Sequence, residues 1–251
     1  MALMDEFREE RENIKNGTWQ QKLSYFWEYY KWYVIIPAII IFSLVWYIHH
    51  MITKTDDILH GLLINAHTME AQTSADELAT EFIEKMKIDT KEYSITFNTS
   101  VTYIADDTSG TANYETTQAL MAWIAAGTID FMSGDIDAMT DLAYKQYTVD
   151  LRDVLSKDEL AKYEPYFLYI DQAVIDARSK AFENNEDGSD IVIPDCTKPE
   201  TMEKPIPVMI DISKCDALSE IYGETDDLAL GIANNAPNVE TLMDFLEYIT
   251  E

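Results

Sequence analysis

The residues best suited to chemistry follow predicted strands in the C-terminal part of the chain. They are Asn65, His67, Ser100, Tyr103, Ser133, Gly134 and Asp135. Amide, imidazole, hydroxyl and carboxylate groups of this kind bind small polar or cationic molecules. Because the carboxyl ends of parallel strands meet at one edge of a sheet, we expect a ligand site there. The alternative for each residue is an ordinary polar loop position.

Catalysis at this edge would depend on His67. With an acidic partner, its imidazole could serve as the general base of a hydrolase. Otherwise it is an exposed or hydrogen-bonded histidine. The chain contains no Gly-x-Ser-x-Gly, His-Glu-x-x-His, Gly-Lys-Ser/Thr, Cys-x-x-Cys or Rossmann fingerprint. We therefore expect no enzyme, no catalytic residues and no cofactor.

The candidate residue groups for metal binding do not predict a metal site. Asp135, Asp137 and Asp141 lie at the start of a predicted helix. There, Asp135 and Asp137 complement the positive end of the helix dipole, which is the alternative to a divalent metal. Cys196 and Cys215 match no zinc motif. They are either free thiols or, outside the cytoplasm, a disulfide.

An apolar segment near the N-terminus predicts a membrane anchor. Residues 32–53 are 22 positions without Lys, Arg, Asp or Glu. At ~1.5 Å per residue, a helix of this length crosses the ~30 Å core of a bilayer. We place the span at Tyr33 to Ile52, with a tolerable kink at Pro37. The alternative is a helix buried in a soluble core. Aromatic residues flank the span: Tyr25, Phe26, Trp27, Tyr29, Tyr30, Trp32, Trp46 and Tyr47.

Basic residues predict the orientation of this anchor. Five precede it, whereas only Lys54 lies between it and Lys85. By the positive-inside rule, residues 1–24 are a cytoplasmic tail, 25–54 the anchor with its interfacial flanks, and 55–251 a translocated domain at the cell surface. The apolar run exceeds a signal-peptide core of ~7–15 residues, and no small-residue cleavage site follows it. It is therefore expected to remain as an uncleaved signal anchor.

The formal charge of −28 belongs to the C-terminal domain. Residues 1–54 hold six basic and six acidic side chains, which leaves 12 Lys and Arg against 40 Asp and Glu for residues 55–251. Such a domain repels phosphate, so nucleic acid is excluded as a partner. The acidic surface provides solubility or, alternatively, attracts a cationic ligand or a divalent metal.

Strand and helix patterns alternate after the anchor. Strands are predicted at residues 58–65, 93–101, 128–132 and 228–233, and around Ile191 and Val208. Helices are predicted from a capping box at Ser74 and Glu77, over residues 113–126, and from residues 133–135. A last helix starts at Asn238 with Val239, Leu242, Met243, Leu246 and Ile249 on its apolar face. Repeated strand–helix units predict an α/β fold with a mostly parallel sheet covered by helices.

Two segments carry a resemblance to a known family. The stretch AAGTIDFMSGDIDAMTDLAYKQYTVDLRDVLSKDELAKYEPY, residues 125–166, resembles the first lobe of the extracellular solute-binding proteins of bacterial ABC importers. The tail GIANNAPNVETLMDFLEYI, from Gly231, is similar to that family's final strand and capping helix. The resemblance implies one lobe of a periplasmic-binding-protein fold. Only residues 168–227 are available for a second lobe, so that lobe is absent or vestigial. The anchor replaces the usual lipidated cysteine.

These patterns predict a non-catalytic binding or scaffold protein held in the bilayer by residues 33–52. Its expected ligand is small or cationic. An alternative is an accessory subunit of a membrane transport or secretion complex, in which the partner is another membrane protein. A third hypothesis, an extracytoplasmic hydrolase, depends on His67.

Overall fold

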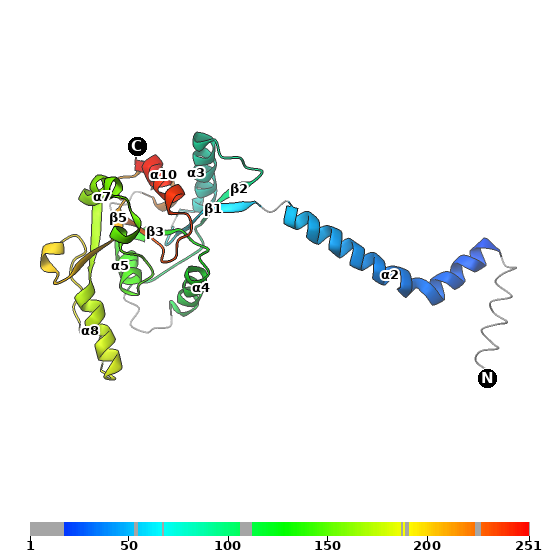
Figure 1. Ribbon diagram of the computed structural model, residues 1–251, viewed down its shortest axis with the longest axis horizontal. Coiled ribbons are helices and arrows are strands. Elements are labelled where there is room, and N and C mark those ends of the chain that lie inside the picture. The colour runs from blue at the N-terminus through cyan, green and yellow to red at the C-terminus, as the bar shows by residue number, and fades with distance from the viewer. Residues whose placement is uncertain are drawn as a thin grey trace. The chain divides into compact units, whose positions relative to one another are not determined.

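The computed structural model describes residues 18–52, 55–66, 68–105, 112–186, 188, 191–223 and 227–250. The chain divides into two compact units, Met1–Lys54 and Thr55–Glu251. Each unit is described by itself. In Figure 1 the second unit contains the sheet and its covering helices.

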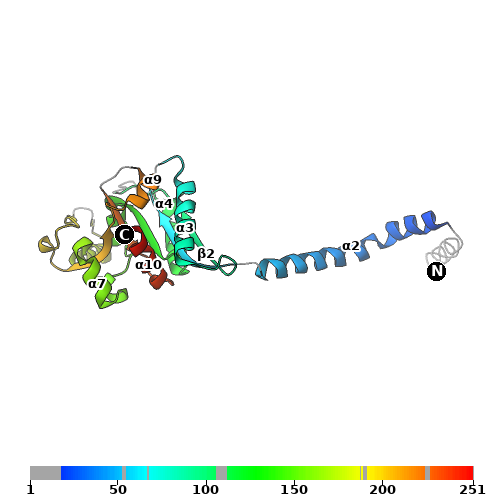
Figure 2. The same cartoon turned by 90° about the horizontal axis from the view of Figure 1, so that it is seen from above.

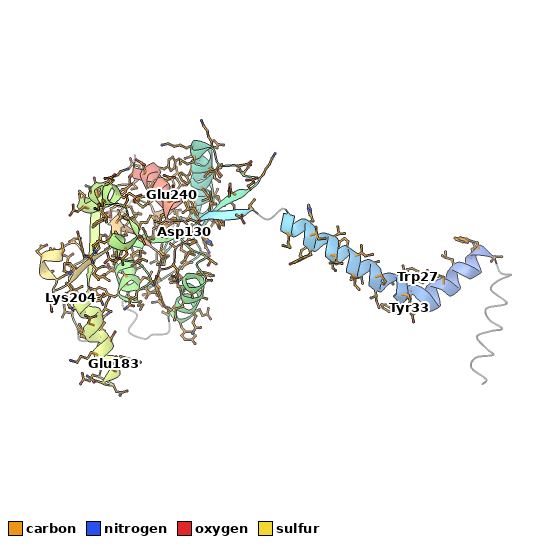
Figure 3. The ribbon with its side chains drawn as sticks, in the orientation of Figure 1. Trp27, Tyr33, Asp130, Glu183, Lys204 and Glu240 are labelled. Carbon is orange, nitrogen blue, oxygen red and sulfur yellow. The ribbon has the colours of Figure 1, made fainter. Side chains whose placement is uncertain are left out.

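In the first unit, the described residues form the long helix α2 (Trp19–Ile52). Its segment Lys31–His49 is long and apolar enough to cross a membrane, and none of that window is buried. The helix bends near Tyr33 (Figure 3). This is the bend expected from Pro37, whose ring clashes with the carbonyl four residues earlier and removes one helical hydrogen bond. The helix begins well before the predicted span, so the aromatic flank is part of the same helix.

The second unit is a six-stranded sheet in the order β2-β1-β3-β6-β5-β4. Its strands are β1 (Asp56–Leu63), β2 (Tyr93–Asn98), β3 (Phe131–Asp135), β4 (Phe167–Asp171), β5 (Pro205–Asp211) and β6 (Leu228–Ile232). The helices are α3 (Ala71–Met86), α4 (Tyr114–Ala125), α5 (Ile136–Tyr144), α6 (Leu151–Val154), α7 (Lys157–Tyr163), α8 (Gln172–Glu183), α9 (Ser219–Tyr222) and α10 (Val239–Thr250). Short 3-10 helices among the described residues are η1 (Glu164–Tyr166), η2 (Pro199–Thr201) and η3 (Asp216–Leu218).

Helices cover both faces of the sheet, as the α/β pattern predicts. One hydrophobic cluster joins the sheet to α3, α7, α9 and α10, and the other joins it to α4, α5 and α8. Figure 1 shows α3 and α10 above the sheet and α4, α5 and α8 below it, and Figure 2 shows α3, α9 and α10 from above. The core is therefore two apolar layers on either side of one sheet.

The expectation of a mostly parallel sheet is wrong, because the sheet is mixed. β1 runs parallel to β2 and β3, whereas β6 is antiparallel to β3 and β5, and β4 is antiparallel to β5. The connection from β5 to β6 contains η3 and α9. This connection stays at one edge of the sheet, where Tyr222 of α9 bonds Ser133 of β3. A connection that does not cross the sheet returns the chain antiparallel.

Two predicted strand assignments also change. The segment around Ile191 forms no strand in the part of it that the structure describes, and it includes Pro194, which has no N–H for a ladder. The missed strand is β4, which lies within residues expected to form a second lobe. The described part of residues 168–227 instead adds β4 and β5 to the single sheet.

Helix boundaries shift by a few residues. The predicted capping box at Ser74 is wrong, because α3 begins at Ala71 and the Ser74 N–H already donates to the Glu70 carbonyl at 2.9 Å. Lys87 ends α3 in a left-handed conformation with φ of 54°. The helix expected from residues 133–135 starts at Ile136, with the Asp135 side chain as its N-cap.

Candidate functional site

Asn65 joins three of the segments predicted to form the site. It follows β1 with a left-handed φ of 58°. Its Nδ2 donates to the Tyr103 carbonyl and to Asp135 Oδ2, both at 2.7 Å, and its Oδ1 accepts the Tyr103 N–H at 2.8 Å. Asp135 Oδ1 accepts the Ala138 N–H at 2.8 Å. The amide therefore connects the ends of β1 and β3 with the segment after β2.

Tyr103 is a buried residue of this cluster, 2% exposed. Its hydroxyl donates to Asp141 Oδ2 at 2.6 Å. Lys145 forms an ion pair with that carboxylate at 2.8 Å and also donates to the Tyr103 hydroxyl. The Lys145 ammonium lies 5.0 Å from the centre of the Tyr103 ring. Asp141 is thereby neutralised by a neighbouring lysine, as in an ordinary i,i+4 helix pair.

Ser133 and Gly134 belong to β3 itself, whereas the sequence placed them in a loop. Ser133 is 1% exposed. The Tyr222 hydroxyl donates to the Ser133 carbonyl at 2.9 Å and lies 2.9 Å from Ser133 Oγ. Burial raises the pKa of Tyr222, so this hydroxyl stays neutral. A Cβ on Gly134 would lie 3.0 Å from the Ile64 carbonyl oxygen, which explains glycine there.

The remaining two predicted residues are Ser100 and His67. Ser100 is exposed and bonds locally, with Oγ donating to Asn98 Oδ1 at 2.6 Å. His67 lies outside the described residues, so the hydrolase hypothesis stays a prediction. The structure thus brings Asn65, Tyr103, Ser133, Gly134 and Asp135 to one edge, where Asn65 bonds Tyr103 and Asp135, and Ser133 bonds Tyr222.

Replacing Asn65 by alanine is expected to destabilise the domain by about 2–4 kcal/mol. The change removes three hydrogen bonds and leaves a non-glycine residue without a polar side chain at positive φ. Thermal unfolding of the full chain in mild detergent measures this loss of stability. The matched control is Asn98→Ala, which removes local bonds only. Equal effects of the two changes would contradict the linking role of Asn65.

Acidic side chains gather at the same edge around Asp227, which precedes β6. Burial raises the pKa of the Asp227 carboxyl, and the charges of Asp137, Asp135 and Asp211 raise it further. Among the described residues, no group of three or more His, Cys, Asp or Glu side chains is arranged to hold a metal ion. These carboxylates repel one another.

Replacing Asp227 by asparagine is expected to stabilise the domain slightly at pH 7. Because the folded state raises this pKa above 3.8, the folded state binds the proton more tightly. Stability is therefore highest below the unfolded pKa and falls as pH rises through the folded value. Water screens this largely accessible group, so the gain is expected within about 0.5 kcal/mol. Unfolding temperatures at pH 4 and pH 7 test this prediction. The difference in unfolding temperature between the variant and the wild type should be smaller at pH 4.

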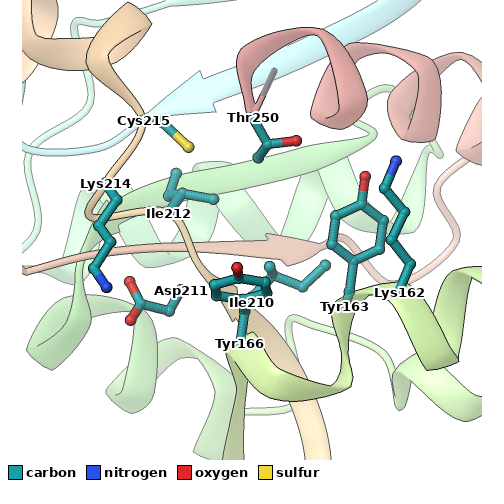
Figure 4. A pocket seen from close by; sticks show the side chains of 9 residues that line it. All are labelled: Lys162, Tyr163, Tyr166, Ile210, Asp211, Ile212, Lys214, Cys215 and Thr250. Atoms are coloured by element: carbon teal, nitrogen blue, oxygen red, sulfur yellow. The ribbon is translucent and has the colours of Figure 1, made fainter.

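A cavity lies at the edge of the sheet where β1 and β3 end. It is beside β5, which is two strands along from β3. β5 is antiparallel to β6, so it runs in the direction of β1 and β3, and its end meets η1 and α7. The cavity has a volume of 330 Å³. Figure 4 shows all of its lining side chains, and those used below are Lys162, Tyr163, Tyr166, Ile210, Asp211 and Lys214. None of the seven predicted site residues lines it. The strand around Val208 was predicted, whereas β4, which places η1 and α7 beside the end of β5, was not.

Both cysteines are free thiols. Cys196 is buried, and Cys215 lines the cavity. Burial, with Asp211 and Asp216 nearby, raises the pKa of the Cys215 thiol to about 11. A thiol that stays protonated is a poor nucleophile. Of the two alternatives, the structure supports free thiols.

Comparisons with known proteins find one structural neighbour and no family. No protein-family model and no curated protein matches the sequence. The fold is weakly similar to an ABC substrate-binding protein of Listeria monocytogenes solved in complex with cycloalternan, with a TM-score of 0.26 and 15% identity. The chain is not assigned to a family. The match covers 50% of this chain and 34% of the Listeria protein, so the chain spans about a third of that protein's length.

Proposed function

We propose that this chain is a single-pass membrane protein whose C-terminal α/β domain is extracytoplasmic and serves binding or scaffolding, without catalysis. Helix α2 carries the proposal. A helix in the core of a soluble protein is mostly buried, whereas none of Lys31–His49 is buried by protein. An apolar surface of this length is stable in a bilayer. The acidic domain then stands outside, in agreement with the excess of basic residues before the span.

Membrane fractionation and protease protection test the proposed anchoring. In a bacterial host, the full chain is expected in the carbonate-resistant membrane fraction, with its C-terminal domain digested by protease added to spheroplasts. The double change Ile40→Asp and Phe42→Asp places two charges mid-span, each costing about 2.5–3.5 kcal/mol, and should reduce insertion. Trp19→Asp, outside the apolar window, is the control. A domain protected from external protease would contradict the orientation.

A second candidate function is that of an accessory subunit of a membrane complex. The specific observation in its favour is an apolar hollow on α2, lined by Trp32, Tyr33, Ile36 and Pro37. Hollows of this kind accept side chains of neighbouring helices. The variant Ile36→Cys tests this function. Its new cysteine should form a disulfide crosslink with a helix of another membrane protein. A specific product with another membrane protein would favour this function, and the control is a cysteine at Ile40.

A further inference from the structure

A buried tyrosine forms part of the wall of the cavity beside β5. Tyr163, at the end of α7, is 4% exposed, and the Lys162 ammonium lies 5.2 Å from the centre of its ring. Figure 4 shows its ring at the cavity wall with the hydroxyl on the side of Lys162 and Thr250. Protein atoms enclose this hydroxyl, so the part of Tyr163 that the cavity presents to a ligand is its ring.

The same cavity has the shape and lining suited to a flat ring. Tyr163 and Tyr166 supply aromatic walls, and Ile210, 1% exposed, supplies an apolar floor. Aromatic pairs prefer offset or edge-to-face contacts with centroids about 4.5–7 Å apart. Its volume of 330 Å³ is at the small end of ligand cavities, which run from about 300 to 1,000 Å³. A ligand with one ring system therefore suits it.

Opposite charges line the cavity as well. Asp211 ends β5, and Lys214 follows it after a turn in which the Ser213 N–H and hydroxyl both donate to Asp211 Oδ1, at 2.9 Å and 2.6 Å. Lys162 is paired with Glu247 at 2.7 Å, so its charge is already compensated. The charged groups of the lining that can recognise a ligand are then the Asp211 carboxylate and the Lys214 ammonium. This pair complements a molecule that itself carries both charges.

We propose that this cavity binds a small zwitterion bearing a planar ring, the chemistry of a free aromatic amino acid. Its carboxylate faces Lys214, its ammonium faces Asp211, and its ring lies between Tyr163 and Tyr166. The proposal rests on the binding role proposed above and names the site and ligand class for it. A zwitterion has no net charge, so the domain's −28 does not repel it, whereas a phosphorylated ligand would be repelled.

Calorimetric titration of the full chain in detergent micelles tests the ligand class. L-tryptophan is expected to bind saturably with a Kd below about 1 mM. L-leucine, which lacks the ring, and indole, which lacks both charges, are each expected to bind at least about tenfold more weakly. No heat with L-tryptophan, L-tyrosine or L-phenylalanine overturns the proposal. Equal affinity for L-leucine overturns the ring assignment, and equal affinity for indole overturns the charge recognition.

Two variants locate the site. Tyr166→Leu, at a position 49% exposed, removes one aromatic wall, so it is expected to weaken L-tryptophan binding about three- to tenfold while changing the unfolding temperature little. Lys214→Gln, at an exposed position, should weaken binding by at least about tenfold. Lys157→Gln, an exposed lysine on the same helix as Tyr163, is the matched control. Binding unaffected by both cavity variants overturns the site. Membrane topology is measured separately, so failure here is distinguishable from failure of the proposed anchoring.

Discussion

Replacing Phe245 by alanine is expected to lower the free energy of unfolding of the domain by about 3–5 kcal/mol. Phe245 of α10 is 1% exposed. Its ring centroid lies 5.0 Å from that of Phe97, 5.3 Å from Phe82 and 5.6 Å from Phe131. The change removes the ring that joins β2, α3 and β3. Since domains are stable by only about 5–15 kcal/mol, this is a large fraction of the total.

Thermal unfolding of the full chain in mild detergent, followed by circular dichroism, measures the Phe245 effect. For a domain of this size, about 3–5 kcal/mol corresponds to a fall in Tm of roughly 6–20 °C. The matched control is Phe182→Ala on α8, where the side chain is 85% exposed and the change should stay within about 0.5 kcal/mol. A similar Tm for both variants would contradict the packing of α10 on the sheet.

Replacing Asp130 by alanine is expected to cost about 2–4 kcal/mol, the second large effect. Asp130 precedes β3 and is 1% exposed. Its carboxylate accepts the backbone N–H groups of His60 and Asn238, each at 2.8 Å, and the Asn238 side-chain amide at 3.3 Å. Removing the carboxylate leaves these donors without their acceptor. β1 and the start of α10 would then lose their common connection.

Hydrogen exchange separates this local role from a general effect of charge. Asp130→Asn keeps one side-chain acceptor, so it should lose less stability than Asp130→Ala. Asp153→Ala removes an exposed acid and should change the unfolding temperature little. In Asp130→Ala, amides at the start of α10 should exchange faster than those of α8. Equal acceleration throughout the domain would be evidence against the specific connection.

Phe245 shows what a helical pattern can and cannot predict. The periodicity after Asn238 predicted an apolar face of Val239, Leu242, Met243, Leu246 and Ile249; the last four are buried, and Val239 is partly buried. It omitted Phe245, which is buried too, because α10 is covered over a wider arc than a single stripe. Phe82 and Phe131 come from distant parts of the chain. Periodicity along a helix therefore identifies a face, whereas the partners of that face depend on the strand order.

The predicted site also shows what the sequence can predict and what depends on the fold. Residues after β1 and β2 do meet β3 at one edge, because parallel neighbours end together. Once there, Asn65 bonds Tyr103 and Asp135, and Tyr222 bonds Ser133, so these groups already serve one another. No local pattern indicates Tyr222, which is 89 positions from Ser133. Whether a polar residue is available to a ligand depends on such long-range partners.

The sequence by itself determined the long apolar helix, the acidity of the domain after it, and the alternation of strands and helices. These are properties of consecutive residues: a run without charge, a count of carboxylates, and a hydrophobic period. Only the tertiary structure decided the mixed strand directions, the internal bonding of the predicted site, and the cavity between Tyr163 and Lys214. The reason is physical, because each of these depends on contacts between residues brought together by the fold, as the 2.7 Å pair of Lys162 and Glu247 illustrates.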